Sequence, residues 1–244
     1  PNYPHGNFYN GYGFFSKIKS KFNGIKIYRL PIIPRKSGSA LMLSLNYLSF
    51  VITGSIFSIF HKKKYDCSFV FAVSPITSAI PAIFHKKFYK TKFNLWVLDL
   101  WPEAATVTGK LKNYFIIKLL NKHARLAMTA ADAVLLTSGT TSLEAMLLKK
   151  PMVVCYKVGF FTYSMVAPFI HTPYIAIPNL LSNSMLVPEL IQSKANVKKI
   201  GVEAKKMFDA DLTRRLIPSY DRLHRQLNEE SGALAADAIV DLLK

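Results

Sequence analysis

The stretch AVLLTSGTTSLEAMLLKKPMVV, residues 133–154, decides the fold class. Its first apolar run ends at Thr137, a glycine and small hydroxyl residues follow, and Leu143, Met146 and Leu147 then repeat at helical spacing. A second apolar run closes the stretch. The pattern predicts a strand, a tight turn, a helix and another strand, which is the repeating unit of a parallel α/β sheet.

The same alternation continues on both sides of this stretch. We expect strands at GIKIYRLPII, CSFVFAVS, FNLWVLDL, DAVLLTS, MVVCYK and YIAIP, and helices over residues 76–89, 111–130, 140–150 and 161–170. Residues 1–24 are rich in Asn, Gly, Tyr and Pro and predict a loop, whereas residues 184–244 predict helices only. The chain is therefore expected to be an α/β protein with parallel sheets.

The positive charge is concentrated in the first half of the chain. The net charge is +18; residues 1–122 carry 18 Lys and Arg against 3 acidic residues, a net +15, and residues 123–244 carry 14 against 11, a net +3. This shift predicts a domain boundary near Asn121–Arg125, with domains 1–122 and 123–244. The first domain should face an anionic partner such as a membrane surface, a phosphorylated ligand or nucleic acid.

Two further patterns bear on the choice among these anionic partners. The segment HKKFYKTKF interleaves basic and aromatic residues, but no nucleic-acid-binding motif accompanies it, so we favour membrane phosphates and expect no nucleic acid. Residues 37–60 carry no charge and are long enough to span a bilayer, yet they contain many Ser, Thr, Asn and Gly residues. A buried or interfacial helix flanked by lysines is therefore expected rather than a membrane span.

The cysteines and acidic pairs indicate no metal or disulfide. Cys67 and Cys155 each lie in an apolar run, which predicts two buried thiols in a cytoplasmic protein. The Asp-Ala-Asp of residues 209–211 has the D-x-D form of some metal-dependent glycosyltransferases, but its helical, charged context predicts a solvated turn. The histidines show no paired metal spacing, and His5 is a general base by residue type only. No metal and no cofactor are expected.

The turn at Ser138-Gly139-Thr140-Thr141 allows three interpretations. A serine nucleophile is disfavoured because the G-x-S-x-G pattern and its His and Asp partners are missing, and a P-loop is excluded because no Lys follows the glycine. A strand-to-helix turn does present backbone N–H groups and a positive dipole end to an anion. Glu144, one turn further, would then reach a ribose hydroxyl. The alternative is a Thr-capped helix with Glu144 near its N-terminus.

The second half of the chain resembles lipid-A-disaccharide synthases. The resemblance rests on residues 131–158, on FTYSMVAPFIHTPYIAIPNLL, LVPELIQ, YDRLHRQL and AADAIVDLL, and extends from about Arg125 to the end. It implies a GT-B glycosyltransferase that moves an acylated glucosamine from a UDP-sugar to a lipid acceptor. It also implies which residues face the donor. These are Ser138, Gly139, Thr140 and Thr141 at the UDP-sugar, Glu144 at the ribose, and Asn179, Glu189 and Gln192 beside the pocket.

The first half resembles the N-terminal domain of family 4 glycosyltransferases, especially those that add amino sugars such as fucosamine to surface polysaccharides. PNYPHGNFYNGYG, AVSPITSAIPA and LDLWPEAATVTGKLKN carry this resemblance. It implies that Asp99 and Glu103 are acceptor-side catalytic carboxylates. The family usually has Arg before that Asp, where this chain has Leu98. From the residues alone, Asp99 follows a buried strand at the edge where α/β sites form, or it caps a turn.

Together these resemblances imply a GT-B-like protein with two incomplete Rossmann-like lobes and a helical C-terminal tail. The expected reaction is hexosyl transfer from a UDP-sugar, as in lipid A and lipopolysaccharide biosynthesis, at the inner face of the bacterial cytoplasmic membrane. The alternatives are a family 4 amino-sugar transferase and an inactive, basic membrane-binding fragment. Two resemblances that meet near residue 122 suggest a fused or recombined chain. The synthase family can exchange C-terminal segments between subunits, which allows a homodimer.

Overall fold

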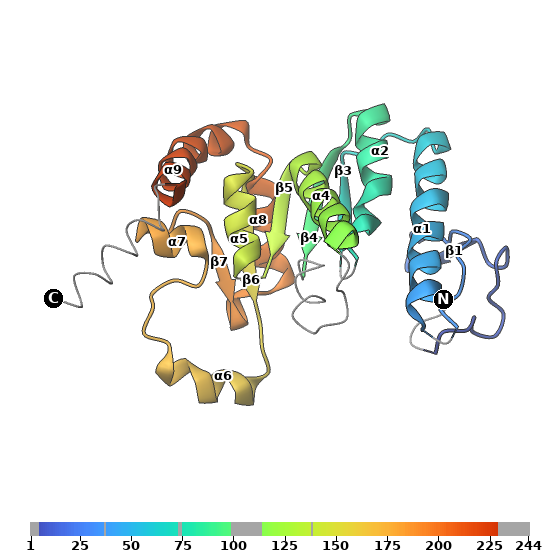
Figure 1. The fold of residues 1–244 in the computed structure, drawn as a ribbon, viewed down its shortest axis with the longest axis horizontal. Helices are drawn as coiled ribbons and strands as arrows, with labels where there is room; N and C mark the ends of the chain where they lie inside the picture. Colours follow the sequence, from blue (N-terminus) through green and yellow to red (C-terminus); the bar gives the residue numbers. More distant parts are fainter. Residues whose placement is uncertain (1–4, 37, 73–74, 99–113, 138, 229–244) are drawn as a thin grey trace. The chain divides into compact units, whose positions relative to one another are not determined.

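The computed structural model describes residues 5–36, 38–72, 75–98, 114–137 and 139–228. The chain divides into two compact units, Pro1–Ala131 and Asp132–Lys244, which we describe separately (Figure 1). Parallel strands alternate with helices in each unit, so the predicted α/β class is confirmed.

Unit 1 opens with a β-hairpin that the sequence did not predict. Strand β1, Lys19–Phe22, pairs antiparallel with β2, Ile25–Tyr28, although residues 1–24 were expected to form a loop. The hairpin is closed by Asn23 and Gly24, which both have positive φ angles, of 47° and 80°. This Asn-Gly pair suits the tight turn that matches the twist of two antiparallel strands. Strand β2 lies within GIKIYRLPII, where a strand was predicted, so this prediction is confirmed and only β1 and its pairing were missed. Strand β1, Lys-Ser-Lys-Phe, carries one apolar residue and gives no alternating pattern.

The rest of unit 1 is a parallel strand pair with its helices. Its elements are α1 (Ala40–Phe60), β3 (Cys67–Ala72), the short 3-10 helix η1 (Ile76–Ala79), α2 (Ile80–Tyr89), β4 (Lys92–Val97) and α4 (Tyr114–Ala130). Strands β3 and β4 pair in parallel from Cys67 opposite Lys92 to Ala72 opposite Val97. Phe93, Leu95 and Val97 of β4 are fully buried and form the core with Met128 of α4.

Unit 2 is built on three parallel strands. Its elements are β5 (Ala133–Leu136), α5 (Thr140–Leu147), β6 (Met152–Tyr156), α6 (Phe160–Val166), η2 (Ala167–Phe169), α7 (Ile177–Ser182), β7 (Glu189–Ile191), η3 (Gln192–Lys194), α8 (Val197–Lys206) and α9 (Ala210–Asn228). Strand β6 pairs with β5 on one side and with β7 on the other. Leu135, Leu136, Met146 and Val153 are fully buried at the centre of this unit. The opening stretch thus forms the strand–turn–helix–strand unit that its pattern predicted.

Two predictions for unit 2 were wrong. YIAIP was expected to be a strand, but no strand is present over 174–178, and α7 starts at Ile177 with Pro178 in its first turn. The N–H groups of Ile175 and Ala176 donate to the Glu189 carboxylate instead of to a neighbouring strand. The tail was expected to contain helices only, but it contains β7. This strand has only three residues, too few for a period-2 pattern to stand out.

The two cysteines also differ from the prediction. Cys155 lies inside β6 and is buried, as expected, whereas Cys67 is exposed because it is the first residue of β3. Burial raises the pKa of the Cys155 thiol to about 11. Neither cysteine forms a disulfide.

Candidate functional site

The candidate site lies where the strands of unit 2 end. Gly139 follows β5, Lys157 and Val158 follow β6, and Gln192 follows β7, so the segments after all three parallel strands meet at the same sheet edge. In open α/β sheets this carboxyl edge is where ligands bind. The turn that begins α5 therefore lies at the edge of the sheet where α/β proteins commonly bind ligands.

Gly139 shapes the turn into α5. Its φ of 102° and ψ of −155° lie in a region that side-chain-bearing residues rarely adopt, and an added Cβ would meet no atom within 4 Å. The glycine is thus required by the backbone conformation, and it leaves open space at the start of the helix. Gly139 itself occupies the N-cap position, so no threonine lies there. The alternative of a Thr-capped helix was therefore wrong.

Ser142 braces the same turn, although the sequence analysis did not single it out. Its side chain is fully buried; its Oγ donates to the Gly139 carbonyl at 2.8 Å and accepts from the Ile177 N–H at 3.2 Å. One hydroxyl therefore links the turn before α5 to the start of α7. The signal was available in the sequence, because a serine three residues after a helix-starting glycine can bond back to the glycine carbonyl.

The neighbouring residues of α5 differ in exposure. Thr140 is exposed, Thr141 is buried and Glu144 is half-buried at the start of the second helical turn. Among the described residues, the Glu144 carboxylate has no hydrogen-bond or ion-pair partner. Glu144 is therefore a carboxylate held near a helix N-terminus without a structural contact that accounts for it. Ser138 lies outside the described residues.

Asn179 and Glu189 form one buried network. The Asn179 Nδ2 donates to the Val187 carbonyl and to Glu189 Oε1, both at 2.8 Å, and its Oδ1 accepts from the Val187 N–H at 2.8 Å. Glu189 Oε1 also accepts from the N–H groups of Ile175 at 3.1 Å and Ala176 at 2.9 Å. The side chain of Asn179 is fully buried. The structure thus brings these two predicted residues together. Their side chains bond to the backbone before α7, at Ile175 and Ala176, and after it, at Val187.

Gln192 has a similar supporting role. Its Oε1 accepts from the Val158 N–H at 2.8 Å and its Nε2 donates to the Val158 carbonyl at 3.2 Å. These paired bonds tie the end of β7 to the segment that follows β6. Glu189 lies in strand β7 and Gln192 in the 3-10 turn that follows it, and both are half-buried.

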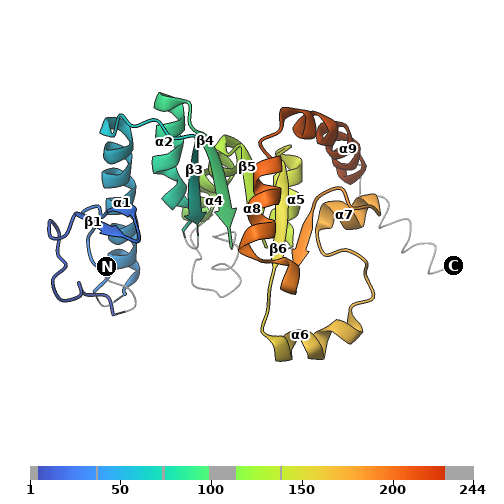
Figure 2. The ribbon, with the colours of Figure 1, turned by 180° about the vertical axis from the view of Figure 1, so that it is seen from behind.

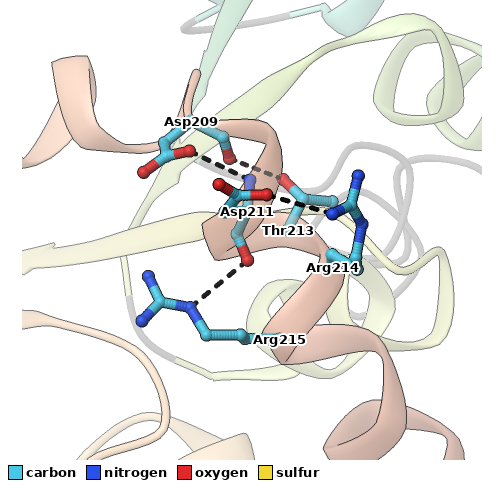
Figure 3. A network of polar contacts seen from close by, with 5 residues as sticks. All are labelled: Asp209, Asp211, Thr213, Arg214 and Arg215. Atoms are coloured by element: carbon cyan, nitrogen blue, oxygen red, sulfur yellow. Dashed lines mark hydrogen bonds and ion pairs between the residues drawn. The ribbon is translucent and has the colours of Figure 1, made fainter.

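The Asp-Ala-Asp segment forms a helix start (Figure 3). Asp209 Oδ1 accepts from the Asp211 N–H at 2.9 Å, and the Asp211 carboxylate pairs with Arg214 at 3.1 Å. The Asp209 carbonyl accepts from the Thr213 hydroxyl, and the Asp211 carbonyl accepts from Arg215 Nε at 3.3 Å. These contacts and the exposure of both aspartates agree with the predicted solvated turn. Among the described residues, no group of three potential metal ligands is present.

The residues predicted on the acceptor side of the site follow strand β4 in the sequence. Asp99 and Glu103, the two tentative catalytic carboxylates, lie outside the described residues. Strand β4, which precedes them, is buried as predicted along most of its length. Their role stays a prediction.

Comparison with known proteins agrees with the resemblance of the second half. A family model described as lipid-A-disaccharide synthetase matches residues 84–240. The chain is similar to lipid-A-disaccharide synthase 2 of Legionella pneumophila strain Paris, with 40% identity over 146 residues, which is 60% of this chain and 38% of that protein. It is similar to lipid-A-disaccharide synthase of Cellvibrio japonicus, with 43% identity over 131 residues, 53% of this chain and 34% of that protein. The chain thus spans well under half the length of these relatives.

These matches bear on the first half as well. The family-model match begins at residue 84, well before the Arg125 at which the resemblance was expected to start. It therefore includes β4 and the part of α4 up to residue 122, which were predicted to belong to a family 4 glycosyltransferase domain. The family 4 resemblance and the idea of a fused chain gain no support from these comparisons.

Proposed function

The chain belongs to the lipid-A-disaccharide synthetase family, and we propose that it binds a UDP-sugar at the turn between β5 and α5 and transfers the sugar to a lipid-linked acceptor. The observation that carries this proposal is the open turn at Gly139, at the carboxyl edge of three parallel strands. Backbone N–H groups at such a helix start favour a diphosphate. The unpartnered carboxylate of Glu144 would accept hydrogen bonds from the ribose hydroxyls.

The residues would divide the work as follows. The bond between the sugar C1 and the diphosphate oxygen breaks, and the start of α5 stabilises the negative charge on the departing UDP. The acceptor hydroxyl oxygen forms the new bond to C1, and a carboxylate such as Asp99, with Glu103 nearby, takes its proton. Asn179, Glu189 and Gln192 would act as positioning residues, since their side chains are engaged by the backbone segments around the site.

The partners are part of the same proposal. The expected acceptor is a glycolipid, and the strongly basic first half would hold the chain at the anionic inner face of the cytoplasmic membrane. Among the described residues, α1 is the one helix with the length and composition to cross a membrane. A homodimer is also proposed. Its supporting observation is that α6 buries none of its residues in unit 2 and stands away from β5–β7 in Figures 1 and 2.

A UDP titration tests the donor site. We expect saturable binding, weakened about 10- to 100-fold in Glu144→Ala, because a hydrogen bond to a charged group contributes about 1.5–3 kcal/mol. Glu203→Ala is the matched control, since Glu203 pairs with Lys206 on α8, away from the turn. The absence of binding at millimolar UDP would contradict the proposal and favour a non-catalytic membrane-binding protein.

A transfer assay tests the reaction. UDP-diacylglucosamine and its monophosphate lipid acceptor should yield the disaccharide and free UDP. Product formed only from UDP-linked amino sugars of surface polysaccharides would instead support the family 4 alternative.

A further inference from the structure

Helix α1 has its polar and apolar faces reversed relative to an ordinary helix of a globular domain. The buried residues are Asn46, Gly54 and Ser58, which are all small or polar. Besides Ala40 and Ser44, the exposed residues are large and apolar and recur mostly at four-residue spacing: Leu41, Leu48, Ile52, Ile56 and Phe60. Phe60 is 74% exposed. An exposed apolar stripe of this length indicates an interaction surface.

The reversal follows from the contacts of the polar face. The segment after the hairpin lies along α1, where the Ile33 N–H donates to Ser49 Oγ at 2.9 Å and the Asn46 amide donates to the Ile33 carbonyl. Arg35 Nε donates to Asn46 Oδ1 at 3.2 Å. Gly54 allows α2 to approach closely, because an added Cβ would lie 2.7 Å from a Pro81 carbon. The polar face of α1 thus packs against the segment around Ile33 and against α2, and the apolar stripe faces outward.

An apolar groove of about 370 Å³ lies between α1, β3 and α2. Its lining includes the rings of Phe57, Phe69 and Phe71, and the two β3 rings are about half exposed. Trp96 of β4 packs edge-on against Phe71, with ring centroids 4.9 Å apart. The volume of the groove lies in the range of about 300–1,000 Å³ that is typical of small-molecule sites.

A basic pocket of about 390 Å³ adjoins this groove. Lys26, Tyr28, Lys63 and Tyr65 line the pocket, and Tyr65 lines the groove as well. Tyr28 also contacts the Phe57 ring of the groove at 5.4 Å. The apolar groove and the basic pocket therefore share a lining residue, Tyr65. This arrangement suits a molecule with a hydrocarbon tail and an anionic head.

Two polar groups in the groove have no partner among the described residues. These are Ser78 Oγ and His85 Nδ1, and the His85 side chain is only 7% exposed. A buried polar group without a hydrogen bond is costly, and both atoms are closed to solvent, so a ligand would reach them only after a shift of the groove side chains. An ester oxygen between a hydrocarbon tail and a phosphate could accept a hydrogen bond from the Ser78 hydroxyl.

We propose that unit 1 binds an anionic phospholipid of the membrane, with an ester-linked acyl chain in the groove and its phosphate between Lys26 and Lys63. The exposed stripe of α1 would lie in the membrane interface and place the groove beside the leaflet from which the chain enters. This inference rests on the proposed membrane location, but it does not depend on sugar transfer. Within residues 5–98 and 114–131, Asp66 is the one acidic residue, so the surroundings suit an anion.

Monomeric lysolipids test this proposal without a bilayer. Myristoyl lysophosphatidylglycerol, below its micelle concentration, should bind saturably by calorimetry, and each methylene removed from the tail should weaken binding about four-fold. The zwitterionic phosphatidylcholine analogue should bind more weakly. Lys63→Ala and Lys26→Ala should each reduce affinity for the anionic lipid about five-fold and bring it towards that of the zwitterionic one.

Matched variants separate the site from general effects. Lys64 is next to Lys63 but lines neither the groove nor the basic pocket, so Lys64→Ala should leave the affinity for the anionic lysolipid unchanged. Phe71→Ser should weaken both lysolipids, whereas Phe22→Ser, an exposed β1 ring away from the groove, should weaken neither. Circular dichroism confirms that each variant is folded, and UDP affinity should be unchanged in all of them, so failure of the lipid site and failure of the donor site are distinguishable.

Three outcomes would overturn the proposal. They are equal affinity for the anionic and zwitterionic lysolipids, unchanged binding by folded Phe71→Ser, and displacement of the lysolipid by a much tighter diacylglucosamine monophosphate. The last outcome would assign the groove to the sugar acceptor.

Discussion

The buried network around Asn179 gives the most informative perturbation of the second unit. Asn179→Ala removes three hydrogen bonds of 2.8 Å, two to Val187 and one to the Glu189 carboxylate. Neutral bonds contribute about 0.5–1.5 kcal/mol each and a bond to a charged group about 1.5–3 kcal/mol, and the remaining partners lose their bonds in a site closed to water. We expect unit 2 to lose about 3–5 kcal/mol of unfolding free energy.

Asn179→Asp gives a sharper result because it changes few atoms. The new carboxyl can still accept from the Val187 N–H, but it has lost both donors and would face the Glu189 carboxylate. Burial and the neighbouring negative charge would raise its pKa, so the variant should be most stable at low pH and lose stability as the pH rises above about 4. The protonated carboxyl can restore one donor, which is why the deficit should shrink in acid.

Hydrogen exchange provides the local measurement. The Val187 amide and the amides of residues 175 and 176 should exchange faster in Asn179→Ala, because they are held directly or through Glu189. Asn121→Ala on the exposed side of α4 is the control and should change neither exchange in unit 2 nor its denaturation midpoint. Unchanged exchange at Val187 together with an unchanged midpoint would refute the assignment of Asn179 as a structural residue.

Three further predictions concern single positions. Gly139→Ala should destabilise the chain by about 1 kcal/mol and lower UDP affinity, because a φ of 102° strains any residue with a side chain. Gly201→Ala inside α8 should stabilise the chain by up to about 1 kcal/mol, because alanine favours the helix and its Cβ meets no other atom. A denaturant titration of both variants checks these two effects. At pH 8, iodoacetamide should modify Cys67 at least about 100-fold faster than Cys155, because Cys155 is buried and its pKa of about 11 leaves little thiolate; equal rates by peptide mass mapping would contradict the burial. Tyr220→Phe should raise the melting temperature, since the buried Tyr220 hydroxyl has no partner among the described residues; a loss of more than about 1 kcal/mol would reveal a bond to it.

The sequence predicts an element of this chain well where a continuous apolar run or a helical repeat marks it. The helices at residues 40–60 and 114–130 and the buried strands β4, β5 and β6 all lie where the pattern places them. The pattern fails where a structure is held by single contacts. The strand expected at residues 174–178 is absent because the Glu189 carboxylate takes the N–H groups that a neighbouring strand would have bound. Such a contact joins residues more than ten positions apart and leaves no periodic signal.

The outward apolar stripe of α1 shows a second limit of the sequence. A run of uncharged residues reports that a helix is apolar, but it does not report which face is buried. Asn46 and Ser49 would ordinarily be assigned to the solvent side, yet they bond to the segment at Ile33. The opposite face, with Leu41, Leu48, Ile52 and Ile56, is exposed instead. The choice between a core helix and an interfacial helix therefore depends on hydrogen bonds between distant residues.

The candidate site shows the same division between position and role. Asn179, Glu189 and Gln192 were predicted to lie beside the donor pocket, and their contacts give these side chains backbone partners. Glu144 differs because no described contact accounts for its carboxylate. The two classes should therefore separate experimentally: Glu144→Ala should weaken UDP binding at unchanged stability, whereas Asn179→Ala should lower stability first and UDP affinity only through the loosened loops. A Glu144→Ala protein that is destabilised but binds UDP normally would place Glu144 among the supporting residues and would leave the backbone turn at Gly139 as the donor contact.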